Sequence, residues 1–296
     1  MLNGVGEMAG LTQALEWGYI ETPILLTNSL SVGRVLQGVT SHMVKKHPEI
    51  GTREDVVLPV VGEADDSFLN DTRVGLCSGQ DAQKALESAR GGPVQQGSVG
   101  AGTGMISFDF AGGIGTSSRV IELDGRAFNV GVFVMSNCGR MRNLTIDGRV
   151  VGRDLDPAFP TEGRRSSSYG SVIVVVATDV PVLSSQLSRV AKRAALGLGR
   201  VGSHAASTSG EIVVVFSTGN RVPRSSSQPS KFRSVKFVAD THINTMYEAV
   251  IEATEEAMLN AVFCSVGQTG RNGRQVPAIP QEMVVELLRK EQGESC

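Results

Sequence analysis

The sequence predicts an α+β fold in which two β-sheets stack between layers of helices. Three observations indicate this class: strand-like runs occur in pairs, helix-like segments occur in pairs, and 35 glycines, well above average usage, mark tight turns. With 296 residues, 41% hydrophobic content and 20% charged residues, the chain can bury a substantial core. It could form one large domain or two ordinary ones.

The first part of the chain is expected to alternate helices and strands. Apolar residues recur at helical spacing from Val32, and Pro48 follows the expected end of that helix. Apolar runs bounded by proline or by polar turn residues predict strands. The expected elements are a helix over 10–17, a strand over 22–29, the helix from Val32, a strand over 56–63, a helix over 81–90 and a strand over 105–110.

Two hairpins and a long loop are expected in the middle of the chain. Residues 120–123 and 129–135 should pair around Asp124-Gly125-Arg126, because Asp-Gly favours the tight turn of a hairpin. Residues 143–146 and 150–151 should pair in the same way around Asp147-Gly148. The segment 153–169 carries prolines, a glycine and a run of serines, which predicts an exposed loop where the chain could be cut.

The last part of the chain combines strands with three expected helices. Apolar residues at helical spacing predict helices over 183–198, 244–264 and 281–291, of which the second is the longest. The apolar run over 212–217 predicts a strand, and 222–230 is expected to be a loop.

Composition argues against several classes of function. The net charge is -2, with 28 basic and 30 acidic residues, so no basic stripe is available for nucleic acid. No apolar run approaches the length of about 20 residues that spans a bilayer, so no membrane partner is expected. The glycine-rich segment Gly97–Gly104 lacks a following Gly-Lys-Ser/Thr and precedes a strand, so no nucleotide cofactor is expected.

Cysteine and histidine positions do not indicate a metal site. The cysteines show neither metal-ligand spacing nor a pairing pattern, which is typical of reduced thiols in a cytoplasmic protein. These residues are Cys77, Cys138, Cys264 and Cys296. His42 and His47 have no partner at ligand spacing and are expected at the surface.

Gly170-Ser171 is the strongest candidate for a reactive site. Six apolar residues follow Ser171, five of them β-branched, which is the composition of a strand buried on both faces. If the chain is cut before Ser171, the hydroxyl stands at the head of a rigid strand and the new α-amine can act as its base. The alternative is an ordinary turn, since Gly-Ser also occurs at Gly97-Ser98 and Gly202-Ser203.

Other polar residues near predicted strands could serve such a nucleophile. Asn137 follows a predicted strand, where its amide could donate to an oxyanion. Ser209 and Glu211 are two residues apart beside a strand and should share one face. A carboxylate in that position needs a partner, and the α-ammonium of Ser171 would supply one. Glu63 ends an expected strand within an acidic cluster.

Eight segments, in order along nearly the whole chain, resemble the DmpA and β-peptidyl aminopeptidase family. They are 21–28, 59–63, 68–71, 100–105, 136–140, 170–177, 209–211 and 269–273. The resemblance implies a single four-layer αββα domain over 1–296, similar to N-terminal nucleophile hydrolases. It further implies self-cleavage into 1–170 and 171–296, a homo-tetramer, no cofactor, and release of N-terminal residues from small peptides, amides or esters.

The resemblance also assigns residue roles. Ser171 matches the nucleophile, Asn137 the oxyanion-hole asparagine, and Ser209 with Glu211 the pair that orients the serine and its amine. Glu63 matches an acidic residue that binds the substrate's ammonium. Phe68 stands where some members place a tyrosine near the oxyanion, and it lacks the hydroxyl.

Two features of the resemblance leave alternatives open. Family members carry several dozen residues before the position of Asn3, so we expect further coding sequence upstream. The expectation of a cytoplasmic location therefore rests on the cysteines. An ornithine-type acetyltransferase shares the architecture and self-cleavage but normally uses threonine where this chain has Ser171. A catalytically inactive, truncated scaffold is the other alternative. Preference among L-, D- and β-amino acids is not encoded in these motifs.

Overall fold

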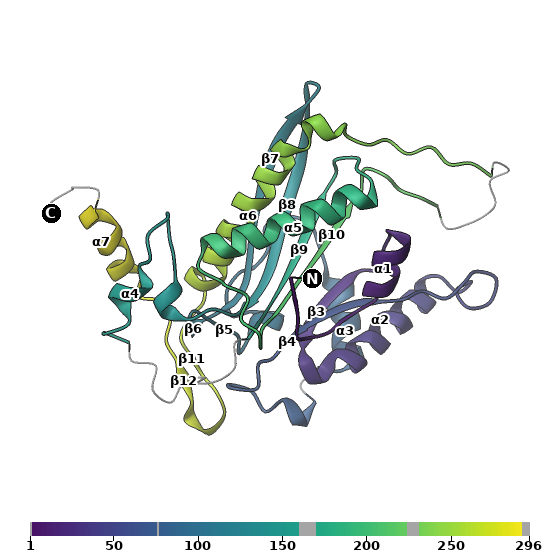
Figure 1. Ribbon diagram of the computed structural model, residues 1–296. Coiled ribbons are helices and arrows are strands. Elements are labelled where there is room, and N and C mark those ends of the chain that lie inside the picture. The colour runs from purple at the N-terminus through teal and green to yellow at the C-terminus, as the bar shows by residue number, and fades with distance from the viewer. Residues whose placement is uncertain (1, 76, 160–169, 224–230, 292–296) are drawn as a thin grey trace.

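The computed structural model describes residues 2–75, 77–159, 170–223 and 231–291, and it confirms the α+β class. Two sheets stack between two helical layers (Figure 1). Helices α5 (Ser184–Arg200) and α6 (Asn244–Phe263) cover the outer face of the larger sheet. Helices α2 (Val32–Lys46) and α3 (Gly79–Ser88) lie beyond the smaller sheet, which completes the αββα order.

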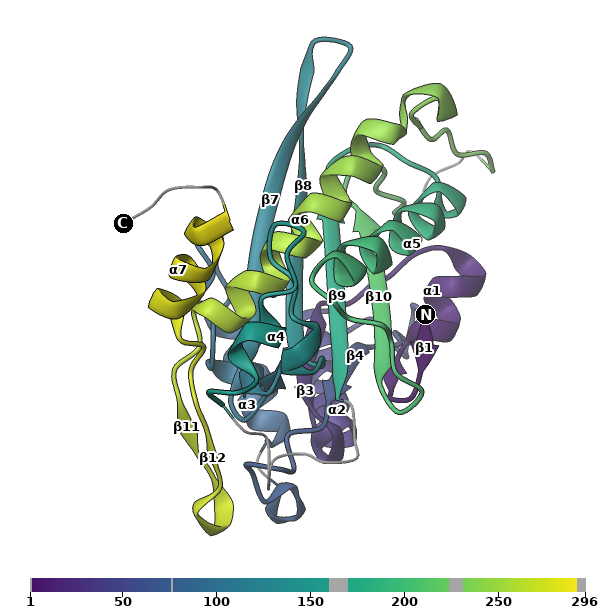
Figure 2. The same cartoon turned by 60° about the vertical axis from the view of Figure 1, so that its left-hand side comes forward.

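The larger sheet has five strands in the order β1-β10-β9-β8-β7. Only β9 and β10 run parallel, and every other pair is antiparallel. The strands are β1 (Asn3–Gly4), β7 (Gly113–Leu123), β8 (Arg126–Asn137), β9 (Ser171–Thr178) and β10 (Gly210–Ser217). Figure 2 shows the β7–β8 hairpin reaching beyond the other strands, so the sequence-predicted hairpin is confirmed and is longer than expected.

The smaller sheet has the order β2-β4-β3, with β3 and β4 parallel. Its strands are β2 (Met8–Ala9), β3 (Ile24–Asn28) and β4 (Val60–Ala64). The remaining short strands are β5 (Ile106–Ser107), β6 (Phe110–Ala111), β11 (Gln268–Thr269) and β12 (Gln275–Val276). The remaining α-helices are α1 (Leu11–Trp17), α4 (Gly152–Leu155) and α7 (Gln281–Glu291).

Strand β9 is the centre of both cores, as its composition predicts. Val172, Val174 and Val176 pack toward α5 and α6, whereas Ile173 packs toward the smaller sheet. Successive side chains of a strand point to opposite faces, so an unbroken apolar run fills two cores at once. Burying each such side chain stabilises the fold by about 1.5–3 kcal/mol.

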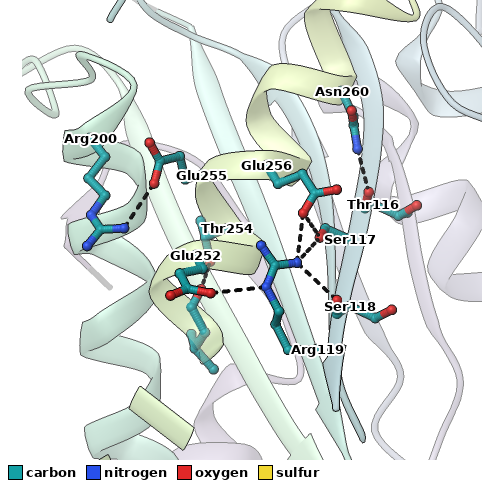
Figure 3. A network of polar contacts seen from close by, with 11 residues as sticks. Thr116, Ser117, Ser118, Arg119, Arg200, Glu252, Thr254, Glu255, Glu256 and Asn260 are labelled. Atoms are coloured by element: carbon teal, nitrogen blue, oxygen red, sulfur yellow. Dashed lines mark hydrogen bonds and ion pairs between the residues drawn. The ribbon is translucent and has the colours of Figure 1, made fainter. Parts of the chain in front are cut away.

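A polar network joins α6 to β7 at the sheet edge (Figure 3). The Arg119 guanidinium contacts Glu256 at 2.7 Å and Glu252 at 3.1 Å, one turn apart on α6. Asn260 Nδ2 donates to the Thr116 carbonyl at 2.9 Å. These ion pairs are partly exposed, and such pairs contribute about 0–1 kcal/mol each to the free energy of unfolding. The network therefore affects the position of α6 more than the stability of the fold.

The N-terminal segment links the two sheets. Strand β1 pairs with β10 in the larger sheet, with Asn3 opposite Glu211. Strand β2 pairs with β4 in the smaller sheet, with Met8 opposite Gly62. The residues between them, Val5–Glu7, therefore cross from one sheet to the other.

Two expected strands differ from the structure. The strand expected over 56–63 begins only at Val60, since Pro59 has no N–H to donate to the ladder. The strand expected over 105–110 is the β5–β6 hairpin, which turns at Phe108 and Asp109 with φ of 51° and 62°. Such a turn is usually Asn-Gly or Asp-Gly, so the sequence carried no signal for it.

The second predicted hairpin forms only its turn. Asp147 and Gly148 have the positive φ that the turn requires, but a single bridge, Ile146 with Arg149, replaces the expected strands. The start of the predicted loop over 153–169 is occupied by α4, and 160–169 lie outside the described residues. Residues 224–230 of the other predicted loop also lie outside them. Among the described helices, none combines the length and apolar character needed to cross a bilayer.

Candidate active site

Sheet pairing brings two of the predicted residues together at the head of β9. Ser171, the first residue of β9, is opposite Asn137, the last residue of β8. On the other side, Ser171 is the register partner of Gly210, the first residue of β10. Ser171 keeps 9% of its surface exposed, so its hydroxyl lies in a mostly buried position at a strand end.

The Asn137 amide is held in one orientation. Its Oδ1 accepts the Ile106 N–H at 2.9 Å, and its Nδ2 donates to the Asp65 carbonyl at 2.7 Å. The side chain is completely buried. The structure therefore places an amide of fixed orientation next to Ser171.

Ser209 and Glu211 form a buried pair beside β9. The Ser209 hydroxyl donates to Glu211 Oε1, which confirms that the two side chains share a face. Both residues are completely buried, and Glu211 Oε2 has no hydrogen-bond partner among the described residues. Burial raises the pKa of the Glu211 carboxyl, although hydrogen bonds from Ser209 and Asn3 act in the opposite direction. The free oxygen makes this carboxyl a ready partner for a cation.

Glu63 reaches the same region from the smaller sheet. It lies in β4, is 6% exposed, and accepts the Glu7 N–H at Oε1 (2.9 Å) and the Ser29 hydroxyl at Oε2. A β-carbon built on Gly6 would lie 2.9 Å from Glu63 Oε1 and 3.9 Å from Ser171 Oγ. The carboxylate and the hydroxyl therefore face the same glycine from two different sheets.

Gly210 allows the N-terminal segment to approach Ser171. A β-carbon at Gly210 would lie 1.8 Å from the Val5 carbonyl oxygen and 3.3 Å from Ser171 Oγ. Any other residue would collide with the backbone of Val5. Gly6 and Gly210 therefore both present bare backbone to Ser171.

Phe68 has a different environment from the other predicted residues. Its ring packs beside a buried cluster that includes Leu69 and Ile106. The Arg274 guanidinium lies 4.8 Å above that ring and donates to the Phe68 carbonyl at 2.9 Å. None of the contacts described for Phe68 involves Ser171.

The sequence did not single out a second buried acid and its partners. Asp66 accepts the Asn70 amide at 2.6 Å, and burial raises the pKa of its carboxyl. Asn70 Nδ2 also donates to the Thr103 carbonyl at 3.4 Å. Only the acidic cluster after Glu63 hinted at this group, because the contacts join segments far apart in sequence. In the described part of the chain, no three His, Cys, Asp or Glu side chains gather as metal ligands.

Gly170 is buried directly before Ser171, whereas the residues that precede it, 160–169, lie outside the described residues. The expected exposed scission loop therefore stays a prediction.

Comparison with known proteins identifies the family. The sequence pattern of peptidase family S58 matches residues 1–276. Beta-peptidyl aminopeptidase BapA from Sphingosinicella xenopeptidilytica is 37% identical over 301 residues, which cover 98% of this chain and 74% of that protein.

Two solved structures share the fold. A beta-aminopeptidase from Burkholderia sp. superposes with a TM-score of 0.90 at 37% identity, covering 98% of this chain and 79% of the other. The L-aminopeptidase D-Ala-esterase/amidase from Ochrobactrum anthropi, described as a prototype serine aminopeptidase with a variant N-terminal nucleophile hydrolase fold, gives a TM-score of 0.91 at 36% identity with the same coverage. The chain therefore belongs to peptidase family S58 and is a hydrolase, a self-processing aminopeptidase of the N-terminal nucleophile type.

Proposed function

We propose that Ser171 is the nucleophile of this aminopeptidase and that cleavage after Gly170 exposes it. The observation that carries the proposal is the convergence at the head of β9. Ser171 there lies beside the fixed Asn137 amide and the Gly210 backbone. Ser171 Oγ and the Glu63 carboxylate both lie near the β-carbon position of Gly6.

Self-cleavage needs only groups of this chain and water. Ser171 Oγ attacks the Gly170 carbonyl carbon, the Gly170–Ser171 amide bond breaks, and the acyl group moves from nitrogen to oxygen. Water then hydrolyses the ester and leaves the Gly170 carboxylate and the free Ser171 α-amine. The single domain of 1–296 thereby becomes two associated chains, 1–170 and 171–296.

The new α-amine acts as general base in turnover. Its neutral form takes the hydroxyl proton of Ser171 while Oγ attacks the substrate carbonyl, and it later passes that proton to the leaving amine. Asn137 donates to the oxyanion. Glu211 Oε2, which has no hydrogen-bond partner in the described part of the chain, accepts from the α-ammonium, and Ser209 holds the carboxyl in place.

Glu63 makes the enzyme an exopeptidase. Its buried carboxylate binds the substrate's free α-ammonium, which sets the first residue of the substrate over Ser171. The substrates are small peptides, amides or esters with a free amine. The proteins compared above are aminopeptidases, and they do not support an acetyltransferase or an inactive scaffold.

We further propose a homo-tetramer located in the cytoplasm. Three large apolar side chains of α1 and the following turn are about half or more exposed: Leu15, Trp17 and Tyr19. Such a patch supports self-association. Among the described residues, Cys77, Cys138 and Cys264 form no disulfide, which supports a reducing compartment. Light scattering on the purified protein and cell fractionation test the two statements separately.

A panel of aminoacyl p-nitroanilides tests the proposed function. Wild-type protein should release p-nitroaniline from free-amine substrates, and its gel should show two bands that correspond to 1–170 and 171–296. Active wild-type enzyme that runs as one uncut band would contradict the assignment of Ser171.

A further inference from the structure

The segment Val5–Glu7 lies beside the proposed site, because Gly6 is near both Glu63 and Ser171. Its neighbours pair with the larger sheet on one side and the smaller sheet on the other. Val5 lies against Gly210, and the Glu7 N–H donates to Glu63 Oε1 at 2.9 Å. The segment is therefore held at both ends, with Gly6 in between.

Gly6 lies next to both the proposed nucleophile and the proposed acid. It is exposed, and its φ of +137° favours glycine. A β-carbon there would lie 2.9 Å from Glu63 Oε1, closer than carbon and oxygen normally approach, and 3.9 Å from Ser171 Oγ. Even a methyl group would thus fill the gap between these two oxygens.

We propose that Gly6 determines substrate access, because its missing side chain leaves room for the amine-bearing residue of the substrate. This inference rests on the proposed function. The ammonium of the substrate must meet Glu63 while its carbonyl carbon meets Ser171 Oγ. The atoms that connect them have to pass the bare backbone face of Gly6.

Self-cleavage does not use that space. The Gly170 carbonyl is delivered to Ser171 by the chain itself, and no ammonium has to enter beside Glu63. A side chain at position 6 should therefore separate the two reactions. Maturation continues, whereas turnover of amine-bearing substrates fails.

The test compares Gly6→Ala with wild type and with Gly92→Ala. Gly92 also has a positive φ, +103°, but no atom of the described residues lies within 4 Å of its β-carbon position. The Gly92→Ala variant therefore reports the cost of backbone strain alone. We expect Gly6→Ala to show both bands on a gel. Its kcat/KM for aminoacyl p-nitroanilides should fall on the order of a hundredfold, mainly through KM. Gly92→Ala should match wild type.

Hydrolysis of p-nitrophenyl acetate supplies a second readout. This ester has no amine, does not need Glu63, and reports only whether Ser171 reacts. Gly6→Ala should keep its wild-type rate on this ester. Equal losses on both substrates, or no loss on either, would overturn the inference.

Wild-type protein provides a test that does not depend on folding of the variant. An N-methyl group on the substrate amine would enter the same gap, so N-methylglycyl p-nitroanilide should react at least about tenfold more slowly than the glycyl substrate. Equal rates would overturn the role of Gly6. Absence of any aminopeptidase activity in wild type would instead overturn the proposed function.

Discussion

Glu63 and Ser171 belong to different sheets and face each other across Gly6, whose β-carbon position lies 2.9 Å from the carboxylate and 3.9 Å from the hydroxyl. Substitution of Glu63 should therefore change which substrates are accepted. N-acetylated substrates should not react with wild type, because the buried carboxylate would lose a partner worth about 2–5 kcal/mol.

The variant Glu63→Gln should lose kcat/KM on free-amine substrates and no longer distinguish them from acetylated ones. Glu87→Gln, on the exposed side of α3, is the matched control. Equal turnover of N-acetylated and free-amine substrates by wild type would show that Glu63 does not bind the substrate's ammonium.

Self-cleavage should depend on the Ser171 hydroxyl. Ser171→Ala should run as one band and lose about 10⁶-fold in kcat. Ser203→Ala alters the pair Gly202-Ser203, which lies between α5 and β10, and this variant should still give two bands. Two bands from Ser171→Ala would show that another protease, or another residue, makes the cut.

Asn137 should act on the rate of reaction. Asn137→Ala should lower kcat by about 10²- to 10³-fold, as expected for loss of an oxyanion donor. It also leaves the Ile106 N–H and the Asp65 carbonyl without their partner, which costs about 1–3 kcal/mol each in unfolding free energy. Asn129→Ala removes an amide near the opposite end of β8 and should leave kcat unchanged. Similar kcat values in the two variants would contradict the role of Asn137.

The pH profile of the mature enzyme should report the Ser171 α-amine. Free α-amines have a pKa of about 7.7–8.0, and only the neutral amine can act as base, so kcat/KM should rise through neutral pH. The negative charge of Glu211 stabilises the ammonium and raises the pKa of the amine, so the rise in kcat/KM moves to higher pH. Glu211→Gln should move the rise in kcat/KM back to lower pH. An unchanged rate and profile would show that Glu211 does not contact the amine.

The uncut protein should show the cost of burying Glu211 without a cation. Burial raises the pKa of its carboxyl above the ordinary 4.5, so the fold prefers the protonated form. The contribution of Glu211 to stability is then fully present below pH 4.5, and it decreases as the pH rises through the raised pKa of the carboxyl. In the uncut Ser171→Ala protein, adding Glu211→Gln should reduce this decrease in melting temperature.

Glu256 supplies a control of opposite sign. Hydrogen bonds from Ser117 and Arg119 lower its pKa, so Glu256 stabilises the fold once ionised. Adding Glu256→Gln to the uncut protein should lower the melting temperature at neutral pH. If both substitutions shift the curve in the same direction, the charge argument for Glu211 is wrong.

Local pattern predicted the regular elements well. The central strand from Ser171, the long helix over 244–264 and the helix over 281–291 are present because hydrophobic periodicity reflects which face is buried. The β5–β6 hairpin was missed because Phe108 adopts a left-handed conformation that bulky residues rarely show. Long-range contacts stabilise that turn, and no local signal records them.

The sequence by itself determined which side chains end or begin the central strands: Asn137 before β9, Ser171 at its head, and the Ser209–Glu211 pair beside β10. Alternation along a strand is a local property, so spacing alone put the last two on one face. The family resemblance assigned Glu63 to the same site, and only the tertiary structure showed that Gly6 lies next to both Glu63 and Ser171. Stacking of one sheet on another joins residues more than a hundred positions apart, and it depends on the packing of whole faces, which no short pattern contains.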